Sequence, residues 1–270
     1  MPRFFDRFDD DIRSILLAQI RNLWTHSSTA IEGNTLTLGE TAFIIEEGLT
    51  VSGKSLKDHQ QVIGHARAIE LVYKFLEKEE VVESDLFELH RSVLAEHIVD
   101  VYAPVGAWKN EPNFTNVITE EGSQTWREYP APELIPGLMR QWLSRFNLTC
   151  RTVIRPDEAI KAYADLHLTF VTIHPFFDGN GRMARLLANF PVLWAGLPPV
   201  VVSTEFRREY LEAISGYQNT IIDLAGLEDL GMLPDNDEKS RFLKLCEGFV
   251  ASTRALLEQA EAVQRRKGQW

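Results

Sequence analysis

The spacing of apolar residues is the feature that most restricts the fold of this 270-residue chain. Ile12, Leu16, Ile20 and Leu23 follow one another at steps of four, four and three. Steps of three and four place side chains on one face of an α-helix that packs against a core. Apolar residues recur with helical spacing in further segments: 62–76, 86–94, 134–146, 159–173, 180–194, 204–223 and 238–265. We therefore expect an all-α fold.

A shorter helix and one non-helical segment complete this picture. Between Thr37 and Gly48, the pair Thr37 and Glu40 has the spacing of a capping box, and the glycine is suited to a helix end. From Pro104 to Pro132, glycine, proline and asparagine interrupt short β-prone pieces such as Phe114–Thr119. These breaks predict a small β-hairpin on the surface of the helical fold.

The composition suggests one compact protein without a disordered linker. We expect a single α domain in which residues 1–80 form N-terminal helices and residues 81–270 form a core with C-terminal helices. The 28 basic and 39 acidic residues give a net charge of −11, which argues against a chain that coats nucleic acid or anionic membrane. The two cysteines form no CxxC pair, so we expect no disulfide or zinc site and a cytoplasmic location.

One polar segment interrupts the helical pattern at residues 174–185, with the sequence HPFFDGNGRMAR. We call it the signature segment. Gly179 and Gly181 permit close backbone approach, and the unpaired N–H groups at the start of the following helix attract anions. Arg182 and Arg185 are three residues apart, so both can reach phosphate oxygens from one helix face. This arrangement predicts a site for a polyphosphate.

Two further residues of the signature segment suggest chemistry. Asp178 precedes the glycines, where a carboxylate near phosphates is repelled unless a divalent cation lies between them, and Mg²⁺ suits that mixture of ligands. His174 can accept a proton near neutral pH. Each feature alone has an ordinary explanation, such as a helix cap, a turn or a solvated arginine pair. Their occurrence within twelve residues favours the functional interpretation.

The signature segment resembles that of the Fic family, His-Pro-Phe-x-Asp/Glu-Gly-Asn-Gly-Arg-x-x-Arg, at every fixed position. The resemblance implies a helical core that transfers AMP from ATP to a Ser, Thr or Tyr hydroxyl of a target protein. It implies that His174 is the base and that Asp178 binds Mg²⁺. It further implies a set of nucleotide-binding residues: Gly179, Asn180, Gly181, Arg182 and Arg185. Self-modification and a homodimer remain open, and no nucleic acid or membrane partner is expected.

The predicted hairpin is placed like the flap of that family, which receives an extended target segment as an added strand. By this resemblance the docking residues would be Lys109, Asn110, Phe114, Thr115, Asn116 and Val117. The ordinary alternative is a surface loop with no docking role.

A second resemblance lies near the N-terminus, where Ser28, Glu32 and Gly33 match the family's inhibitory motif, Ser/Thr-x-x-x-Glu-Gly/Asn. It implies that Glu32 pairs with Arg185 and denies it to the γ-phosphate. The ordinary alternative is a helix end with Gly33 as the terminating glycine.

Several functional alternatives stay open at this stage. Glu32 could position a water that removes AMP from a modified target, or the donor could be another diphosphate compound. The chain could also be an ATP-sensing regulatory module with vestigial catalysis. His167 could line the site, and Tyr210 and Tyr217, seven residues apart on one helix face, could flank an adenine, but packing in the core is the simpler interpretation for all three.

Overall fold

The computed structural model describes residues 3–95, 102–118, 124–152 and 155–268. Within these residues the fold is helical apart from one two-stranded antiparallel sheet, which confirms the all-α class with a small hairpin. The α-helices are α1 (Asp10–Ile31), α2 (Leu38–Glu47), α3 (Leu56–Phe75), α4 (Glu83–Leu94), α5 (Ile135–Thr152), α6 (Pro156–Ile173), α7 (Asn180–Leu187), α8 (Asn189–Trp194), α9 (Arg207–Asn219), α10 (Asp237–Phe249) and α11 (Ala251–Lys267). Short 3₁₀ turns occupy Pro132–Leu134, Thr204–Phe206 and Leu230–Met232. The strands are β1 (Phe114–Ile118) and β2 (Gln124–Glu128).

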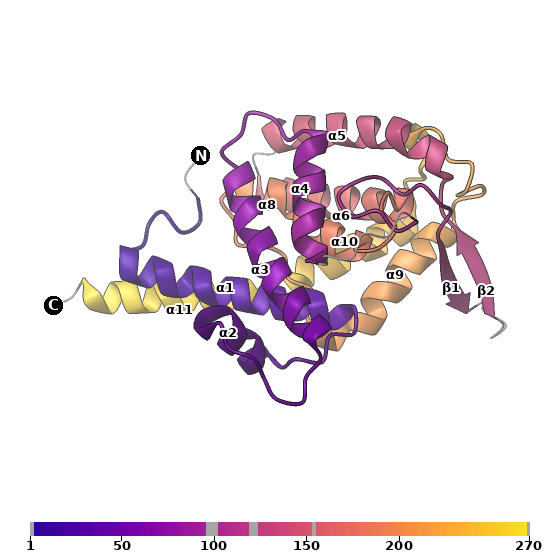
Figure 1. Ribbon diagram of the computed structural model, residues 1–270. Helices are drawn as coiled ribbons and strands as arrows, with labels where there is room; N and C mark the ends of the chain where they lie inside the picture. The colour runs from indigo at the N-terminus through magenta and orange to yellow at the C-terminus, as the bar shows by residue number, and fades with distance from the viewer. Residues whose placement is uncertain (1–2, 96–101, 119–123, 153–154, 269–270) are drawn as a thin grey trace.

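Helix α6 lies at the centre of the molecule (Figure 1). It packs against α5, α7, α8, α9 and α10, and most of its residues are buried. One continuous hydrophobic core joins Trp24 of α1 and Val72 of α3 to Phe170 of α6. The N-terminal helices therefore share the core of the rest of the chain, because their apolar faces have no separate core to cover beyond a small cluster around Ile44.

The expected helix ends are found where the sequence carries capping residues. The Thr37 hydroxyl accepts from the Glu40 N–H at 3.2 Å, and a Glu40 carboxylate oxygen accepts from the Thr37 N–H at 2.8 Å. Gly48 ends α2 with a φ of 68°, in the left-handed region that glycine adopts readily. Both features confirm the short helix predicted between Thr37 and Gly48.

Two expected helices are each split into two. The helix expected over 180–194 is divided into α7 and α8, because Pro191 has no N–H to donate to a carbonyl one turn earlier. The helix expected over 238–265 is divided into α10 and α11 at Val250, where Phe249 and Val250 are both buried and the Phe249 carbonyl accepts from Val201 N–H at 3.4 Å. Tertiary contacts thus override the helical period at this second position.

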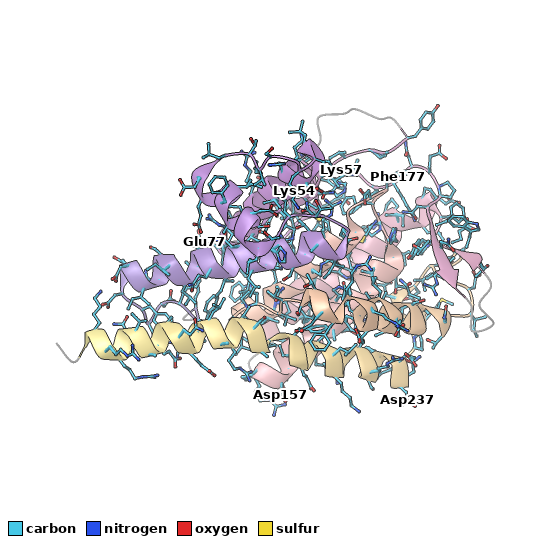
Figure 2. The ribbon with its side chains drawn as sticks, turned by 90° about the horizontal axis from the view of Figure 1, so that it is seen from below. Lys54, Lys57, Glu77, Asp157, Phe177 and Asp237 are labelled. Atoms are coloured by element: carbon cyan, nitrogen blue, oxygen red, sulfur yellow. The ribbon has the colours of Figure 1, made fainter. Side chains whose placement is uncertain are left out.

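Helices α1 and α11 lie side by side and run in opposite directions at one end of the molecule (Figures 1 and 2). Exposed ion pairs join them: Lys267 Nζ lies 3.0 Å from Asp9 Oδ2 and 2.8 Å from Asp11 Oδ1. The other end of α1 reaches the start of α7. Within the described residues no helix is long and apolar enough to span a membrane.

Candidate active site

The signature segment forms the junction between α6 and α7, and two left-handed residues shape it. His174 ends α6 with a φ of 52°, which is uncommon for a residue other than glycine, and Gly179 precedes α7 with a φ of 80°. A Cβ atom on Gly179 would lie 3.2 Å from Leu94 and 3.5 Å from the His90 ring. The dihedral angle at position 179 favours glycine, and the Leu94 side chain would have to shift slightly to admit a Cβ atom.

Hydrogen bonds inside the fold hold this loop. The Phe176 N–H donates to Asn180 Oδ1 at 2.9 Å, and Asn180 Nδ2 donates to the Phe176 carbonyl at 2.7 Å. His90 Nδ1 accepts from the Gly106 N–H at 2.9 Å, so the proton on its Nε2 is donated to the Asp178 carbonyl at 3.0 Å. Burial lowers the pKa of His90 to about 4, which keeps the ring in this neutral, bridging form.

The candidate base, His174, lies at the inner end of the loop and is half-buried. Its ring stacks on Tyr129 with centroids 3.9 Å apart, and its Nδ1 lies 2.8 Å from Asn113 Nδ2 and 3.1 Å from Asn180 Nδ2. Burial, with a smaller contribution from the Lys109 ammonium, lowers the pKa of His174 to about 3. The imidazole is therefore neutral at neutral pH.

Asp178 and Arg182 lie beside the first turn of α7. The Asp178 side chain is 68% exposed, and its Oδ2 lies 3.4 Å from Arg182 Nη2. Arg182 is buried, its Nη1 donates to the Val93 carbonyl at 3.3 Å, and its Nε is buried without a partner among the described residues. Asp178 Oδ1 also accepts from the Gly179 N–H at 2.5 Å. The carboxylate thus lies at the surface of the loop, while the buried guanidinium of Arg182 adds positive charge beside it.

Arg185 is the most completely bonded side chain of the site. Its Nε donates to Ser28 Oγ and its Nη2 to the Ser28 carbonyl, both at 2.9 Å. The same Nη2 donates to Glu32 Oε1 at 2.6 Å, and Nη1 donates to the Tyr210 hydroxyl at 3.1 Å. Burial opposes the charge, but Tyr210 and Glu32 outweigh it and raise the pKa of Arg185. Ser28 and Glu32, at the end of α1, therefore occupy the guanidinium through three hydrogen bonds.

Glu32 also lies directly over the backbone at the start of α7. A Cβ atom on Gly181 would lie 2.5 Å from Glu32 Oε1 and 3.1 Å from Arg185 Nη1. The carboxylate thus fills the space above Gly181 in which the sequence predicts phosphate oxygens. Gly33 follows with a φ of 96°, in the left-handed region that ends α1.

The hairpin stands next to this junction, at the right in Figure 1. Arg127 of β2 donates to Gln218 and Ser215 of α9 at 2.8 and 3.1 Å, and these bonds fix one face. The register pairs Asn116 with Trp126 and Phe114 with Glu128 on the opposite face, where Phe114 is 51% and Trp126 70% exposed.

The expected docking residues do not all lie on this exposed face. Asn116 and Thr115 are exposed in β1, and Val117 pairs with Thr125 through the backbone. Asn110 is exposed before the hairpin, and Thr119, included in the expected strand, lies outside the described residues. Lys109 is buried, and its Nζ donates to Asn113 Oδ1 at 2.6 Å. Its side chain is therefore turned away from any docking surface.

Several residues of the site carried no sequence signal that distinguished them. Asn113 and Tyr129 flank the hairpin and contact His174, and His90 holds the Asp178 carbonyl from α4. Tyr210 is buried, as the core interpretation expects, but its hydroxyl also links Arg185 to His167 Nε2, 2.9 Å away. Their positions in the sequence are far from the signature segment, so only the packing of the helices brings them to it.

Asp178 is compatible with a magnesium ion that arrives with a nucleotide. The described residues contain no group of three or more His, Cys, Asp or Glu side chains placed to hold a metal. Mg²⁺ is commonly bound by one or two carboxylates together with substrate phosphates and waters. The single exposed carboxylate of Asp178, beside the open end of α7, fits that mode.

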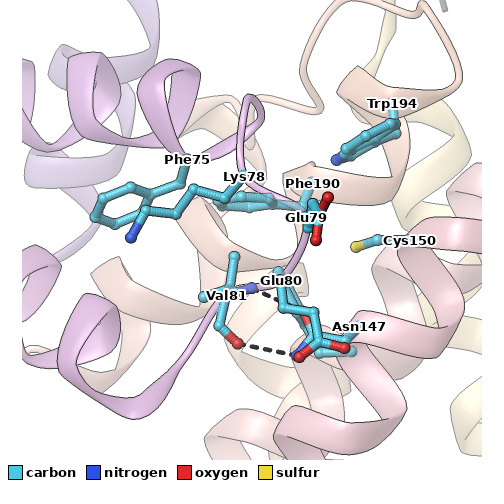
Figure 3. Close-up of a pocket in the computed structure, with 10 residues that line it drawn as sticks. Phe75, Lys78, Glu79, Glu80, Val81, Asn147, Cys150, Phe190 and Trp194 are labelled. Atoms are coloured by element: carbon cyan, nitrogen blue, oxygen red, sulfur yellow. Dashed lines mark hydrogen bonds between the residues drawn. The ribbon is translucent and has the colours of Figure 1, made fainter.

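A separate surface cavity lies between the α3–α4 connection and helices α5 and α8 (Figure 3). Its walls include Phe75, Phe190 and Trp194, and Asn147 fixes its rim through hydrogen bonds of 3.0 and 2.9 Å to the backbone of Val81. None of the residues of the signature segment or of the inhibitory motif line it. We therefore place the candidate active site at the α6–α7 junction.

Residues 80–192 match the Fic/DOC family. The chain is 35% identical over 195 residues to protein adenylyltransferase fic-1 of Caenorhabditis briggsae, and 35% identical over 193 residues to protein adenylyltransferase Fic of Nematostella vectensis. These matches cover 71% and 70% of this chain but 36% and 42% of the relatives. The chain thus spans less than half the length of these curated relatives.

Solved structures share the fold over nearly the whole chain. A Fic domain containing signaling protein from Bacteroides thetaiotaomicron matches with a TM-score of 0.79 and 27% identity, over 96% of this chain and 93% of that one. Fic-1 from Caenorhabditis elegans matches with a TM-score of 0.71 and 27% identity, over 96% of this chain and 69% of that one. The sequence match, the complete signature segment at the α6–α7 junction and the common fold together show that residues 80–192 of this chain form a domain of the Fic/DOC family.

Proposed function

We propose that the protein is an autoinhibited adenylyltransferase that transfers AMP from ATP to a hydroxyl side chain of a target protein. The observation that carries the proposal is the convergence of three groups at one helix junction: a neutral histidine, an exposed aspartate and an arginine that the inhibitory motif occupies. The names of the relatives support the reaction type, since the relatives in Caenorhabditis briggsae and Nematostella vectensis are named protein adenylyltransferases.

In the proposed reaction, His174 takes the proton of the target hydroxyl while the hydroxyl oxygen attacks the α-phosphorus of ATP. A P–O bond forms to the target, the bond to the β-phosphate oxygen breaks, and pyrophosphate leaves. Such displacements depend mainly on positioning and charge neutralisation. The N–H groups of Asn180, Gly181 and Arg182 at the start of α7 have no partner within the helix and suit the phosphate oxygens.

Asp178 would hold Mg²⁺, which when bound would supply charge neutralisation for the phosphates of ATP. Arg182 would support the loop charge, and Arg185 would bind the γ-phosphate end. Arg185 can do so only after its bond to Glu32 is broken, because Nη2 is taken and the carboxylate lies over Gly181. This competition is the proposed basis of autoinhibition.

The hairpin would receive an extended segment of the target at its exposed face. Phe177, 40% exposed and labelled in Figure 2, lies on the hairpin side of that view and adds apolar surface beside the site. Self-modification would use the same geometry. We retain residues 1–80 as an inhibitory N-terminal part, residues 81–270 as the catalytic part and the cytoplasm as the setting, where two buried free cysteines would stay reduced.

The test is transfer of label from α-labelled ATP, with Mg²⁺, to proteins of a lysate and to the chain itself. We expect Glu32→Gly to raise the incorporation of label and His174→Ala in the Glu32→Gly background to abolish it. Mass spectrometry then identifies the modified residue. If the Glu32→Gly protein binds ATP but transfers no label, the proposal is wrong and the protein is a nucleotide-binding regulator.

A second assay distinguishes addition from removal of AMP. A target modified beforehand is incubated with the wild-type chain and with Glu32→Ala. Retention of AMP on the target in both samples excludes removal by Glu32. Release by the wild type alone would instead assign Glu32 to water activation and contradict a purely inhibitory role.

A further inference from the structure

The imidazole of His174 is held at one nitrogen by two amide groups. Asn113 Nδ2 lies 2.8 Å and Asn180 Nδ2 3.1 Å from His174 Nδ1. An amide nitrogen can donate a hydrogen bond but cannot accept one. Nδ1 is therefore the acceptor in both contacts, and the neutral ring carries its proton on Nε2.

Other partners determine the orientation of both amides. Asn180 Oδ1 accepts from the Phe176 N–H, and Asn113 Oδ1 accepts from Lys109 Nζ. Both Nδ2 atoms donate to the Phe176 carbonyl, at 2.9 Å from Asn113 and 2.7 Å from Asn180. Each NH₂ group has two hydrogens, so one is given to Phe176 and the other faces His174. Rotating either amide by half a turn would place its oxygen against the Phe176 carbonyl, and its NH₂ group against another donor, the Phe176 N–H for Asn180 or Lys109 Nζ for Asn113.

The opposite edge of the imidazole carries Nε2, which makes no hydrogen bond within the part of the chain that the structure describes. The two asparagines that cover Nδ1 are buried, Tyr129 stacks on one ring face, and His174 as a whole is only half-buried. Nε2 lies across the ring from the buried edge. It is the nitrogen that a target hydroxyl can approach, and it already bears the proton.

We propose that Asn113 is a positioning residue that keeps the proton of His174 on Nε2, so that the ring cannot take a proton there until this amide moves. The inference rests on the proposed function, in which His174 accepts the hydroxyl proton of the target. Before it can do so, Nε2 releases its proton to water and Nδ1 takes a proton from water. Nδ1–H then requires an acceptor where Asn113, the nearer of the two amides, now donates.

The hairpin connects the contact between Asn113 and His174 to the docking of a target. Asn113 directly precedes β1 and Tyr129 directly follows β2. The Tyr129 N–H donates to the Asn113 carbonyl at 3.3 Å, and the Tyr129 and Thr115 hydroxyls lie 2.9 Å apart. A movement of the base of the hairpin would therefore shift two contacts of His174 together: the amide of Asn113 at Nδ1 and the ring of Tyr129 on the face of the imidazole. A target segment bound to the hairpin would thereby move Asn113 away from Nδ1 and allow the proton of His174 to shift from Nε2 to Nδ1.

The proton position can be measured on the full chain without any reaction. NMR of protein labelled with ¹⁵N-histidine separates ring nitrogens with and without a proton, and His174→Ala identifies the signal. We expect Nε2 to be protonated in the wild type. In Asn113→Asp, a carboxylate oxygen that Lys109 can stabilise replaces the donor, and we expect the proton on Nδ1. Asn236→Asp, the same substitution at the N-cap of α10, should leave the ring as in the wild type.

Two results would overturn the inference: a wild-type ring with its proton on Nδ1, or a folded Asn113→Asp protein with its proton still on Nε2. Asn113→Ala guards against misfolding, since it places no charge against the Phe176 carbonyl. Only Asn180 then donates to Nδ1, so the fraction of rings protonated on Nε2 should fall, though less than in Asn113→Asp, and an unchanged fraction contradicts the role of Asn113.

Kinetics test the consequence for the reaction. In the Glu32→Gly background, Asn113→Asp should raise kcat by about tenfold at unchanged KM for ATP, because the base no longer has to change tautomer. If Asn113→Asp carries the proton on Nδ1 but kcat does not rise, the tautomer of His174 does not limit the reaction. If Glu32→Gly alone transfers no label, the proposed function fails, while the NMR result still decides the role of Asn113.

Discussion

Removal of the Glu32 carboxylate should release Arg185 by an amount that the structure allows us to work out. Two unit charges about 4 Å apart attract each other by roughly 4 kcal/mol at an effective dielectric constant near 20. Glu32 is 37% exposed and regains hydration when the pair opens, whereas Arg185 is 3% exposed and keeps its bonds to Ser28 and Tyr210. The net contribution is then about 1–2 kcal/mol.

Because ATP must displace Glu32 to use Arg185, the same free energy opposes the productive complex. Loss of about 1–2 kcal/mol corresponds to roughly a 5- to 30-fold rise in label transfer. We expect Glu32→Gly to show the full rise and Glu32→Gln, which keeps an acceptor oxygen, a smaller one. Glu47→Gln on the exposed end of α2 is the matched control and should leave transfer unchanged.

The assay is the initial rate of label transfer at subsaturating ATP, together with urea unfolding of each variant. Glu32→Gln should lower the free energy of unfolding by about 1–2 kcal/mol, since it leaves a buried guanidinium without its counter-ion. A loss of stability without any rise in transfer would show that the pair is structural only. If neither the rate of label transfer nor the free energy of unfolding changes, the ion pair between Glu32 and Arg185 does not contribute the free energy worked out above.

Two further predictions concern the packing of the same region. Gly181→Ala should push the Glu32 carboxylate aside, because the new Cβ would lie 2.5 Å from Oε1; in that background Glu32→Gln should no longer affect the free energy of unfolding, and a persistent effect contradicts the contact. Burial lowers the pKa of His90 to about 4 and holds those of His65 and His167 well below 6.5. As the pH falls through the ordinary histidine range, the unfolded chain takes up protons on these three side chains, and on His174, that the folded chain does not bind, so the free energy of unfolding should decrease with falling pH. Urea unfolding at pH 6 and pH 5 measures this, and equal stabilities would rule it out.

Much of the fold could be predicted from local sequence, because local forces determine it. The helical period predicts the buried faces of α1, α3, α5 and α6, and the capping box at Thr37 predicts α2. The division at Val250 could not be predicted, since it arises from burial of Phe249 and Val250 against a distant segment. The α7–α8 break had a local cause in Pro191, but a proline early in a helix is often tolerated.

The same distinction between local sequence and tertiary packing applies to the candidate site. The signature segment places a histidine, a carboxylate, glycine amides and two arginines within twelve residues, so sequence alone determines that these groups meet. What lies against them was decided by the tertiary structure. Ser28 and Glu32 reach Arg185 across more than 150 residues because α1 packs on α7. Asn113 and Tyr129 reach His174 because the hairpin folds back onto the α6–α7 junction. Contacts between distant segments depend on how whole helices pack, and no local spacing encodes that packing.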